Sequence, residues 1–353
     1  MKIVHITWVF TFGGIETMLV NICNEQVKLG HDVHLIIMQD SSVESTLYNC
    51  LDKRINIHYG HRKEKGKLII PVILLNILLL KINPNVIHVH SSSMYKLILF
   101  PKYRKITNAT LHALPKPQNT KSIELVPRIF SISDAVRNEL ITYNGTNSIT
   151  IPNGIHPQLI KTRPLKDWIG ILQLVQVSRL DHEDKGQHIL LYAGAELIKK
   201  GFENFMITFI GDGASRTYLE ELTVSLGLKK NVTFLGMKSQ SYIFEHLCDY
   251  DVFVQPSIRE GFGNTVAEAM AAKLGIIVSS GQGPEEIVDY GKYGLVFENG
   301  NPNDCADKIM LYLEHKINLQ QINDAYQHVL ECYDIKETVK AYLNHYVKSK
   351  YCI

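Results

Sequence analysis

Short apolar runs alternate along the whole chain with longer segments in which apolar residues recur every three or four positions. Such runs are typical of buried strands, and the longer spacing is typical of helices that pack on a sheet. The alternation predicts parallel sheets with crossover helices. Strands are expected at residues 3–7, 33–38, 86–90, 129–132, 149–151, 172–177, 206–210, 232–235, 252–255, 276–279 and 295–297.

A polar stretch that follows Gly154 and continues through Trp168 separates two such series and predicts a linker. The chain has 353 residues, which is enough for two domains of ordinary size. We therefore expect an α/β protein with two doubly wound domains, at residues 1–160 and 168–334. Domains of this kind bind ligands beyond the carboxyl ends of their strands, so clusters that follow strands are the candidate sites.

Cysteine spacing and the start of the chain limit the class of protein. The six cysteines show no spacing typical of metal ligands, which argues against structural zinc and against a disulfide framework. The chain enters a strand at once, and no secretion signal is visible. A cytoplasmic location is expected.

The basic residues are concentrated in the first half of the chain. Residues 1–160 hold 17 Lys+Arg against 10 Asp+Glu, a balance of +7, and the remainder holds 20 against 25, a balance of −5. Residues 68–80 are strongly apolar but too short to span a bilayer, which takes about 20 residues. A crossover helix buried on a sheet is the favoured interpretation. The nearby Arg62, Lys63, Lys65 and Lys67 keep contact with a membrane surface open.

Glu260 and Glu268 stand around a turn that is broken by Gly261 and Gly263 and that opens a helix. Glycine lets the backbone approach a ligand closely, and the amides at a helix start favour anions or hydroxyl-rich groups. Ionised carboxylates only accept hydrogen bonds, so the pair suits the vicinal hydroxyls of a sugar or a ribose. A helix-start acid beside a solvated surface acid is the alternative.

Arg179 and Lys185 lie on the loop after the first strand of the second half. Two cations at a strand end suit a diphosphate, and they would also stabilise negative charge on a phosphate leaving group. Pairing with the nearby Asp181, Glu183 or Asp184 is the alternative.

Two further glycine turns follow strands. Gly211 and Gly213 open a helix and are suited to nucleotide contacts, although a plain turn is an equal interpretation. They do not form a Walker loop, because the lysine and hydroxyl partner are missing. Gly13 and Gly14 lack the third glycine of a dinucleotide fingerprint and remain candidates for a phosphate turn.

His88, His90 and His112 lie in or just after strands of the basic half. A metal site would need further ligands and supporting residues that the sequence does not identify, so no metal is expected. His112 is the better candidate for contact with a sugar hydroxyl or an acceptor. A histidine with its hydrogen bonds satisfied at a strand end is the alternative for each of the three.

The order and spacing of these motifs resemble the retaining GT-B glycosyltransferases of glycosyltransferase family 4, nearly from end to end. The matching segments are Gly13-Gly14-Ile15-Glu16, Val86-Ile87-His88-Val89-His90, Ile151-Pro152-Asn153-Gly154-Ile155, Ser178-Arg179-Leu180 with Lys185-Gly186, Ile210-Gly211-Asp212-Gly213, Phe234-Leu235-Gly236, and Glu260 with Glu268.

The resemblance implies two Rossmann-like domains that face a central cleft, with a C-terminal helix at about 335–353 packing back on the first domain. Its catalytic residues would be Glu260, His112, Arg179 and Lys185. Its donor-binding residues would be Gly14, Arg179, Lys185, Gly211, Gly213, Glu260, Gly261, Phe262, Gly263, Asn264, Thr265 and Glu268. Within these sets, Glu260 would hold the donor sugar, Glu268 the ribose, and the two cations the diphosphate.

The implied activity is metal-independent, retaining transfer of a hexose from a nucleoside diphosphate sugar, UDP-linked by expectation. The acceptor would be a glycan or a polyprenyl-linked glycan of a capsule, O-antigen or exopolysaccharide. No nucleic acid is expected as a partner, and peripheral contact with the inner face of the cytoplasmic membrane is. Two alternatives stay open: a sugar-nucleotide epimerase or hydrolase on the same fold, and a degenerate transferase that acts as a binding scaffold.

Overall fold

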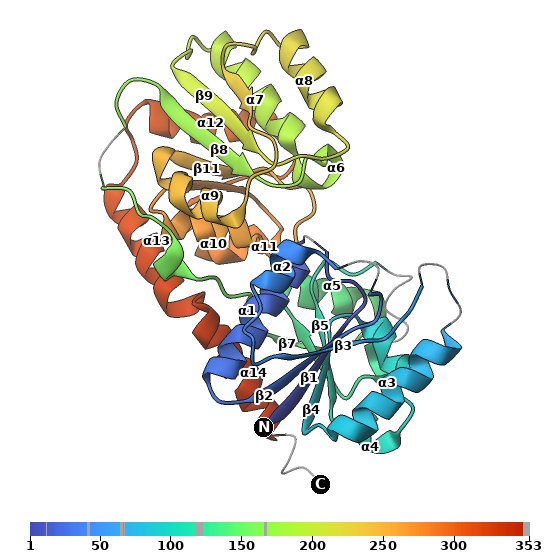
Figure 1. Ribbon diagram of the computed structural model, residues 1–353. Coiled ribbons are helices and arrows are strands. Elements are labelled where there is room, and N and C mark those ends of the chain that lie inside the picture. Colours follow the sequence, from blue (N-terminus) through green and yellow to red (C-terminus); the bar gives the residue numbers. More distant parts are fainter. Residues whose placement is uncertain are drawn as a thin grey trace. The chain divides into compact units, whose positions relative to one another are not determined.

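The computed structural model describes residues 1–11, 13–40, 43–63, 66, 68–116, 123–165 and 168–348. Lys65, Lys67 and the last five residues of the helix expected at 335–353 lie outside this set. The chain divides into two compact units (Figure 1). The first unit comprises Met1–Gly154 and Ile335–Ile353, and the second comprises Ile155–Asp334.

The first unit is built on a seven-stranded parallel sheet in the order β3-β2-β1-β4-β5-β6-β7. Its strands are β1 (Lys2–Thr7), β2 (Asp32–Ile37), β3 (Asn56–Tyr59), β4 (Val86–Val89), β5 (Thr107–Leu111), β6 (Arg128–Ser131) and β7 (Ile149–Thr150). The expected set lacks β3 and β5. The edge strand β3 is only partly buried, and β5 buries Thr107, Asn108 and Thr110, so neither forms the apolar run used to predict strands.

Helices cover both faces of this sheet. They are α1 (Gly14–Lys28), α2 (Ser45–Asn49), α3 (Ile69–Ile82), α4 (Pro101–Lys105), α5 (Asp134–Asn144) and α14 (Ile335–Lys348). On one face, Ile3 and Phe130 pack with residues of α1 and α14. On the other face, Val4 and Ile6 pack with residues of α3, α4 and α5. Successive strand residues therefore belong to different layers, as the pleat requires.

Residues 68–80 form most of α3, which packs on the sheet through Leu75 and Leu79. The favoured interpretation, a crossover helix buried on a sheet, holds for this face alone. Ile70 and Ile73 on another face are 69% and 49% exposed. None of the described helices combines the length and apolarity needed to cross a membrane.

The second unit holds a six-stranded parallel sheet in the order β10-β9-β8-β11-β12-β13. Its strands are β8 (Leu172–Val177), β9 (Phe205–Ile210), β10 (Val232–Phe234), β11 (Val252–Gln255), β12 (Gly275–Ser279) and β13 (Leu295–Phe297). Its helices are α6 (His182–Lys185), α7 (Gln187–Lys199), α8 (Arg216–Ser225), α9 (Gln240–His246), α10 (Asn264–Ala271), α11 (Gly283–Ile287), α12 (Pro302–Leu313) and α13 (Leu319–Cys332). The two parallel sheets with interleaved helices confirm the expected doubly wound α/β class.

Candidate functional site

The predicted donor-binding residues of the second unit follow neighbouring strands of its sheet. Arg179 and Lys185 come after β8, Gly211 and Gly213 after β9, and Glu260 after β11. Because all these strands run parallel, their carboxyl ends share one edge of the sheet. The loops are also bonded to one another, since the backbone N–H of Leu180 donates to the carbonyl oxygen of Asp212 at 3.0 Å.

Lys185 and Glu260 form an ion pair at this edge. The Lys185 Nζ lies 2.5 Å from Glu260 Oε2, and the two side chains are only 21% and 16% exposed. The backbone N–H of Glu260 donates to Gln282 Oε1 at 2.9 Å, and Gln255 Nε2 lies 3.4 Å from Glu260 Oε2. The fold thus holds one cation and one carboxylate together, in positions where charged or hydroxyl-rich ligand groups are recognised.

Arg179 pairs with Asp181, which is one of the partners considered for it from the sequence. Its guanidinium donates to Asp181 Oδ2 at 2.8 Å, and the Arg179 side chain is 65% exposed. An exposed ion pair of this kind contributes little to stability and exchanges readily. The guanidinium therefore keeps the freedom to turn toward an anionic ligand.

Two glycines let the loops of this edge approach closely. Gly186 has φ +65°, and a Cβ built on it would lie 1.8 Å from the carbonyl oxygen of Pro256. Gly211 has φ +139°, and its Cβ would lie 1.9 Å from the carbonyl oxygen of Ser178. Both backbone angles favour glycine, and no side chain fits either position. These glycines keep the cation-bearing loop in contact with its neighbours.

The turn before α10 is fixed by its own packing. Gly263 has φ +97° and precedes Asn264 and Thr265, which form the first turn of the helix. The Phe262 ring is 4% exposed and stands edge-on to Tyr333, with ring centroids 5.7 Å apart. The Phe262 side chain therefore belongs to the core, and only its backbone is suited to ligand contact.

Glu268 lies inside α10 and is 8% exposed. Burial raises the pKa of its carboxyl group to about 8. At neutral pH the free protein therefore holds this group mostly protonated. This differs from the expectation of two ionised carboxylates, and the cause is desolvation, which depends on the tertiary fold.

In the first unit, buried histidines form a hydrogen-bonded chain. His5 Nε2 lies 2.8 Å from Gln26 Oε1, and His5 Nδ1 lies 3.0 Å from His90 Nε2. His90 Nδ1 then lies 2.9 Å from His112 Nε2. If the Gln26 oxygen accepts from His5 Nε2, then His90 Nε2 donates to His5 and His112 Nε2 donates to His90. His112 is left with Nδ1 as an acceptor. That atom is shielded from solvent and has no partner among the described residues.

Three buried histidines of this unit have a spacing that resembles a metal site. Ligand atoms of His5, His88 and His90 lie within 4.8 Å of one another. Each ring nitrogen of the three is engaged, however, since His88 bonds Tyr346 at 2.5 Å and Thr110 at 2.7 Å. The arrangement favours a network of neutral imidazoles over a set of metal ligands.

Desolvation governs the charge of this network. Burial lowers the pKa of His5 and of His112 to about 4, and it lowers the pKa of His88 and His90 well below the usual value. Sequence reasoning missed His5. The signal was the strand period of two, which places residues 3, 5 and 7 of β1 on the same face as His88 and His90.

Gly14 is the first residue of α1, and a Cβ built on it meets no described atom within 4 Å. A Cβ on the neighbouring Gly13 would lie 2.7 Å from Glu16 Oε2. This close atom is the end of a flexible side chain, which can turn away, and the space beside Gly14 is open.

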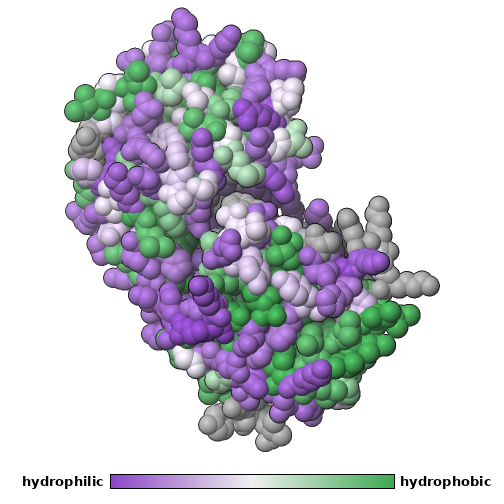
Figure 2. All heavy atoms as spheres, viewed as in Figure 1, coloured by the Kyte–Doolittle hydropathy of each residue, from purple (hydrophilic) through white to green (hydrophobic). Residues whose placement is uncertain are grey.

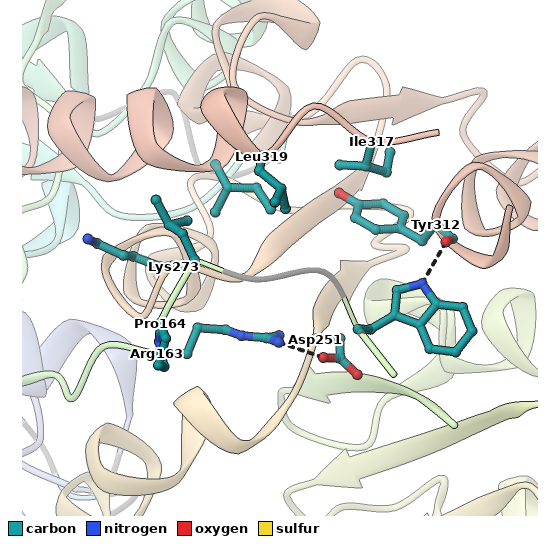
Figure 3. A pocket seen from close by; sticks show the side chains of 10 residues that line it. Arg163, Pro164, Asp251, Lys273, Tyr312, Ile317 and Leu319 are labelled. Atoms are coloured by element: carbon teal, nitrogen blue, oxygen red, sulfur yellow. Dashed lines mark hydrogen bonds and ion pairs between the residues drawn. The ribbon is translucent and has the colours of Figure 1, made fainter. Parts of the chain in front are cut away.

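A pocket lies at the opposite edge of the second sheet (Figure 3). Asp251 and Lys273, which line it, stand just before β11 and β12 and hence at the amino ends of these strands. Arg163 pairs with Asp251 at 2.7 Å, and Trp168 Nε1 donates to the carbonyl oxygen of Tyr312 at 2.7 Å. This pocket is separate from the loops that carry Lys185 and Glu260.

Two sequence families match the chain in succession. The family described as Glycosyltransferase Family 4 matches residues 12–159, and the family described as Glycosyl transferases group 1 matches residues 172–328. The two matches cover most of the chain.

Individual relatives are similar at modest identity. The uncharacterized glycosyltransferase MJ1607 of Methanocaldococcus jannaschii is 32% identical over 173 residues, which cover 47% of this chain and 43% of that protein. The capsular polysaccharide biosynthesis glycosyltransferase CapM of Staphylococcus aureus is 28% identical over 214 residues, covering 57% and 54%. The chain thus spans about half the length of the curated relatives it matches.

A solved structure extends the likeness to the fold of the whole chain. The crystal structure of Anabaena Alr3699/HepE in complex with UDP and glucose has a TM-score of 0.81 and 18% sequence identity. The similarity covers 99% of this chain and 100% of that one. At this identity the likeness establishes the fold.

Proposed function

The chain belongs to glycosyltransferase family 4, whose members have the GT-B fold, and from this premise we propose that it transfers a hexose from a nucleoside diphosphate sugar to an acceptor. The Lys185–Glu260 ion pair at the carboxyl edge of the second sheet carries the proposal. The pair offers a cation for a diphosphate and, in direct contact with it, a carboxylate for sugar hydroxyls.

The donor would lie along this edge in a defined order. Its diphosphate binds Lys185 and Arg179, its hexose bonds Glu260, and its ribose bonds Glu268. The turn glycines Gly211 and Gly213 contact the nucleotide, and the backbone at 261–265 contacts the sugar and the phosphates. The glutamates act as clamps in this proposal and not as an acid and base pair.

The reaction would break the bond between the anomeric carbon and the diphosphate oxygen. Negative charge then develops on the leaving diphosphate, and fixed cations stabilise it more in the transition state than in the bound donor. Lys185 and Arg179 would supply this stabilisation without a metal. The acceptor oxygen forms the new bond with retention of the anomeric configuration, and its proton leaves with the diphosphate.

Two residues of the first unit complete the proposal. His112 would contact a hydroxyl of the transferred sugar, and its unpartnered Nδ1, which is shielded from solvent in the free protein, would become the acceptor when neighbouring residues move on donor binding. Gly14 would approach the donor phosphates or the acceptor, as the open space beside it permits.

We further propose a UDP-linked hexose as donor and a glycan or polyprenyl-linked glycan as acceptor, in the synthesis of a surface polysaccharide. The UDP and glucose of the HepE complex and the capsular role of CapM support this choice. The enzyme would work in the cytoplasm, peripherally at the inner face of the membrane.

Titration calorimetry with UDP, followed by a panel of nucleotide sugars, tests the function. We expect binding of UDP, slow hydrolysis of one donor without acceptor, and a product whose anomeric NMR signals match the donor configuration. Failure to bind UDP at millimolar concentration would overturn the assignment in favour of a scaffold. Isomerisation of a donor in the absence of any acceptor would identify an epimerase instead.

A further inference from the structure

The helix α3 exposes apolar side chains and buries a polar one. Ile69, Ile70, Ile73, Ile77 and Leu80 are 42–69% exposed. Asn76, the only polar residue among positions 69–80, is 3% exposed and donates to the carbonyl oxygens of Val72 and Leu97 at 2.8 Å. This arrangement reverses the usual distribution on a surface helix, in which the polar face meets water.

The exposed residues form one continuous surface. At 3.6 residues per turn they fall within an arc of about 100° on the helix, with Lys81 at its border. Leu99 and Phe100 extend the surface, because the Leu99 N–H donates to Asn76 Oδ1 at 2.8 Å. Figure 2 shows these apolar residues gathered over α3. We call the exposed residues Ile69, Ile70, Ile73, Ile77, Leu80, Leu99 and Phe100 the α3 surface.

The chain segment that contains α3 carries charge of one sign. Residues 65–123 contain eight lysines and one arginine and no aspartate or glutamate. Lys102 lies at the end of the helix, where its Nζ is 3.1 Å from Oδ1 of the capping residue Asn83. Lys81, Lys96 and Lys105 are exposed as well. A solvent-exposed apolar patch flanked by exposed lysines matches the boundary between acyl chains and anionic headgroups.

We propose that the α3 surface docks the protein on a bilayer that contains anionic lipids, with the isoleucines entering the headgroup boundary and Lys81 and Lys102 meeting phosphates. The helix would lie in the plane of the membrane surface. This inference names the surface for the peripheral placement within the proposed function, and it does not depend on donor chemistry. The exposed lysines beside the apolar residues favour a lipid surface over a second copy of the chain, whose like charges would face each other.

Vesicle sedimentation of the full chain tests the proposal. Vesicles of phosphatidylcholine with phosphatidylglycerol are expected to bind the protein, and vesicles of phosphatidylcholine alone at least about fivefold more weakly. The triple variant Ile70→Ser/Ile73→Ser/Ile77→Ser is expected to lose about tenfold in partition. The matched triple Leu159→Ser/Val224→Ser/Met237→Ser changes side chains of similar exposure in the second unit and should bind as the parent does.

The cations are tested separately. Lys81→Gln/Lys102→Gln is expected to weaken binding about fivefold and to reduce its salt dependence, whereas the exposed pair Lys229→Gln/Lys230→Gln is the control. Circular dichroism melting verifies that each variant folds. Equal binding by the triple variant and the parent would overturn the proposal, as would a parent that binds no vesicle and instead forms a dimer which the triple variant abolishes.

Donor turnover in solution distinguishes the two proposals. The triple variant should hydrolyse the donor at the parent rate, because α3 carries none of the proposed donor-binding residues. Vesicle binding without turnover would refute the enzyme assignment alone. Turnover without vesicle binding would refute the docking surface alone.

Discussion

Lys185 and Glu260 stand 75 positions apart in the sequence, and their charged atoms meet at 2.5 Å. In the unliganded protein the ammonium group is therefore already neutralised by a carboxylate. A phosphate that binds there must share the ammonium with Glu260, so the two residues make opposite contributions to the binding of a bare nucleotide.

Substitutions at this pair are expected to separate the two roles. Lys185→Ala should lower donor turnover about 10²-fold, as the loss of a group that stabilises developing charge does. Glu260→Gln should also lower turnover, yet it should bind UDP about fivefold more tightly, because the freed ammonium meets the phosphates without competition. Steady-state kinetics and calorimetry with UDP measure both effects.

The control for this pair is a second enclosed ion pair of the same unit. Arg163 and Asp251 lie 2.7 Å apart with similarly small exposure, at the opposite edge of the sheet. Arg163→Ala should lower the unfolding midpoint and leave the turnover of the folded protein unchanged. Full activity in both Lys185→Ala and Glu260→Ala would contradict the donor assignment.

Glu268 is expected to make the stability of the second unit depend on pH. Its pKa of about 8 exceeds the ordinary value of 4.5, so the folded state binds the proton more tightly than the unfolded state does. The contribution of Glu268 to the free energy of unfolding is fully present below about pH 4.5. It is lost as the pH rises toward 8, by an amount on the order of 4 kcal/mol. Glu268→Gln should remove this dependence, and Glu221→Gln, on the exposed side of α8, should not.

Denaturation followed by tryptophan fluorescence measures the effect. The chain has two tryptophans, of which Trp8 lies in the first unit and Trp168 in the second. A Trp8→Phe background therefore reports the second unit.

Ribose hydroxyls that donate to the charged carboxylate of Glu268 should lower its pKa, so UDP binding near pH 7 should release a proton. Calorimetry in buffers of different ionisation enthalpy would detect that release, and its absence would argue against ribose contact.

The histidine chain is expected to destabilise the first unit in acid. The pKa values of His5 and His112 are lowered from 6.5 to about 4, so these histidines bind protons more tightly in the unfolded state than in the folded state. The free energy of unfolding should be highest above about pH 6.5 and should fall as the pH drops toward 4, by on the order of 3 kcal/mol for each histidine. Trp8 fluorescence in a Trp168→Phe background measures this.

Two further results would identify the hydrogen-bonded chain itself. Nitrogen-15 NMR at pH 7 should find His112 neutral, with the proton on Nε2. His5→Gln should reduce the pH dependence by the contribution of one histidine, whereas His246→Gln, which alters an exposed histidine of the second unit, should leave it unchanged. Protonated imidazoles at pH 6 would contradict the assigned network.

Glycine substitutions are expected to differ according to the space around each position. Gly211→Ala places a Cβ 1.9 Å from a backbone oxygen at φ +139° and should cost more than about 3 kcal/mol of stability. Gly227 also has a positive φ, but a Cβ there meets no described atom within 4 Å. Gly227→Ala should therefore cost only about 1 kcal/mol, the penalty of the left-handed backbone. Equal losses would show that the contact at Gly211 relaxes freely.

The sequence predicted most strands because they form short apolar runs, and four of these runs end directly before a glycine or proline. It failed at β5, where Thr107, Asn108 and Thr110 are buried by partners that only the fold supplies. The candidate residues after strands were predictable, since strand ends gather at one edge of a parallel sheet. The pairing of Lys185 with Glu260 and the protonation of Glu268 were not, because both depend on distance and solvation in the folded unit.

The helix α14, which comes late in the sequence, covers the buried histidines of the first unit. Its Tyr346 bonds His88, which lies 258 positions earlier in the sequence. During synthesis on a ribosome, residues 155–334 emerge as one continuous segment and can complete their sheet before α14 exists. The first unit, although its strands are made first, must wait for Tyr342 and Tyr346 to cover its buried imidazoles. The part of the protein that is translated first is thus the part that finishes folding last.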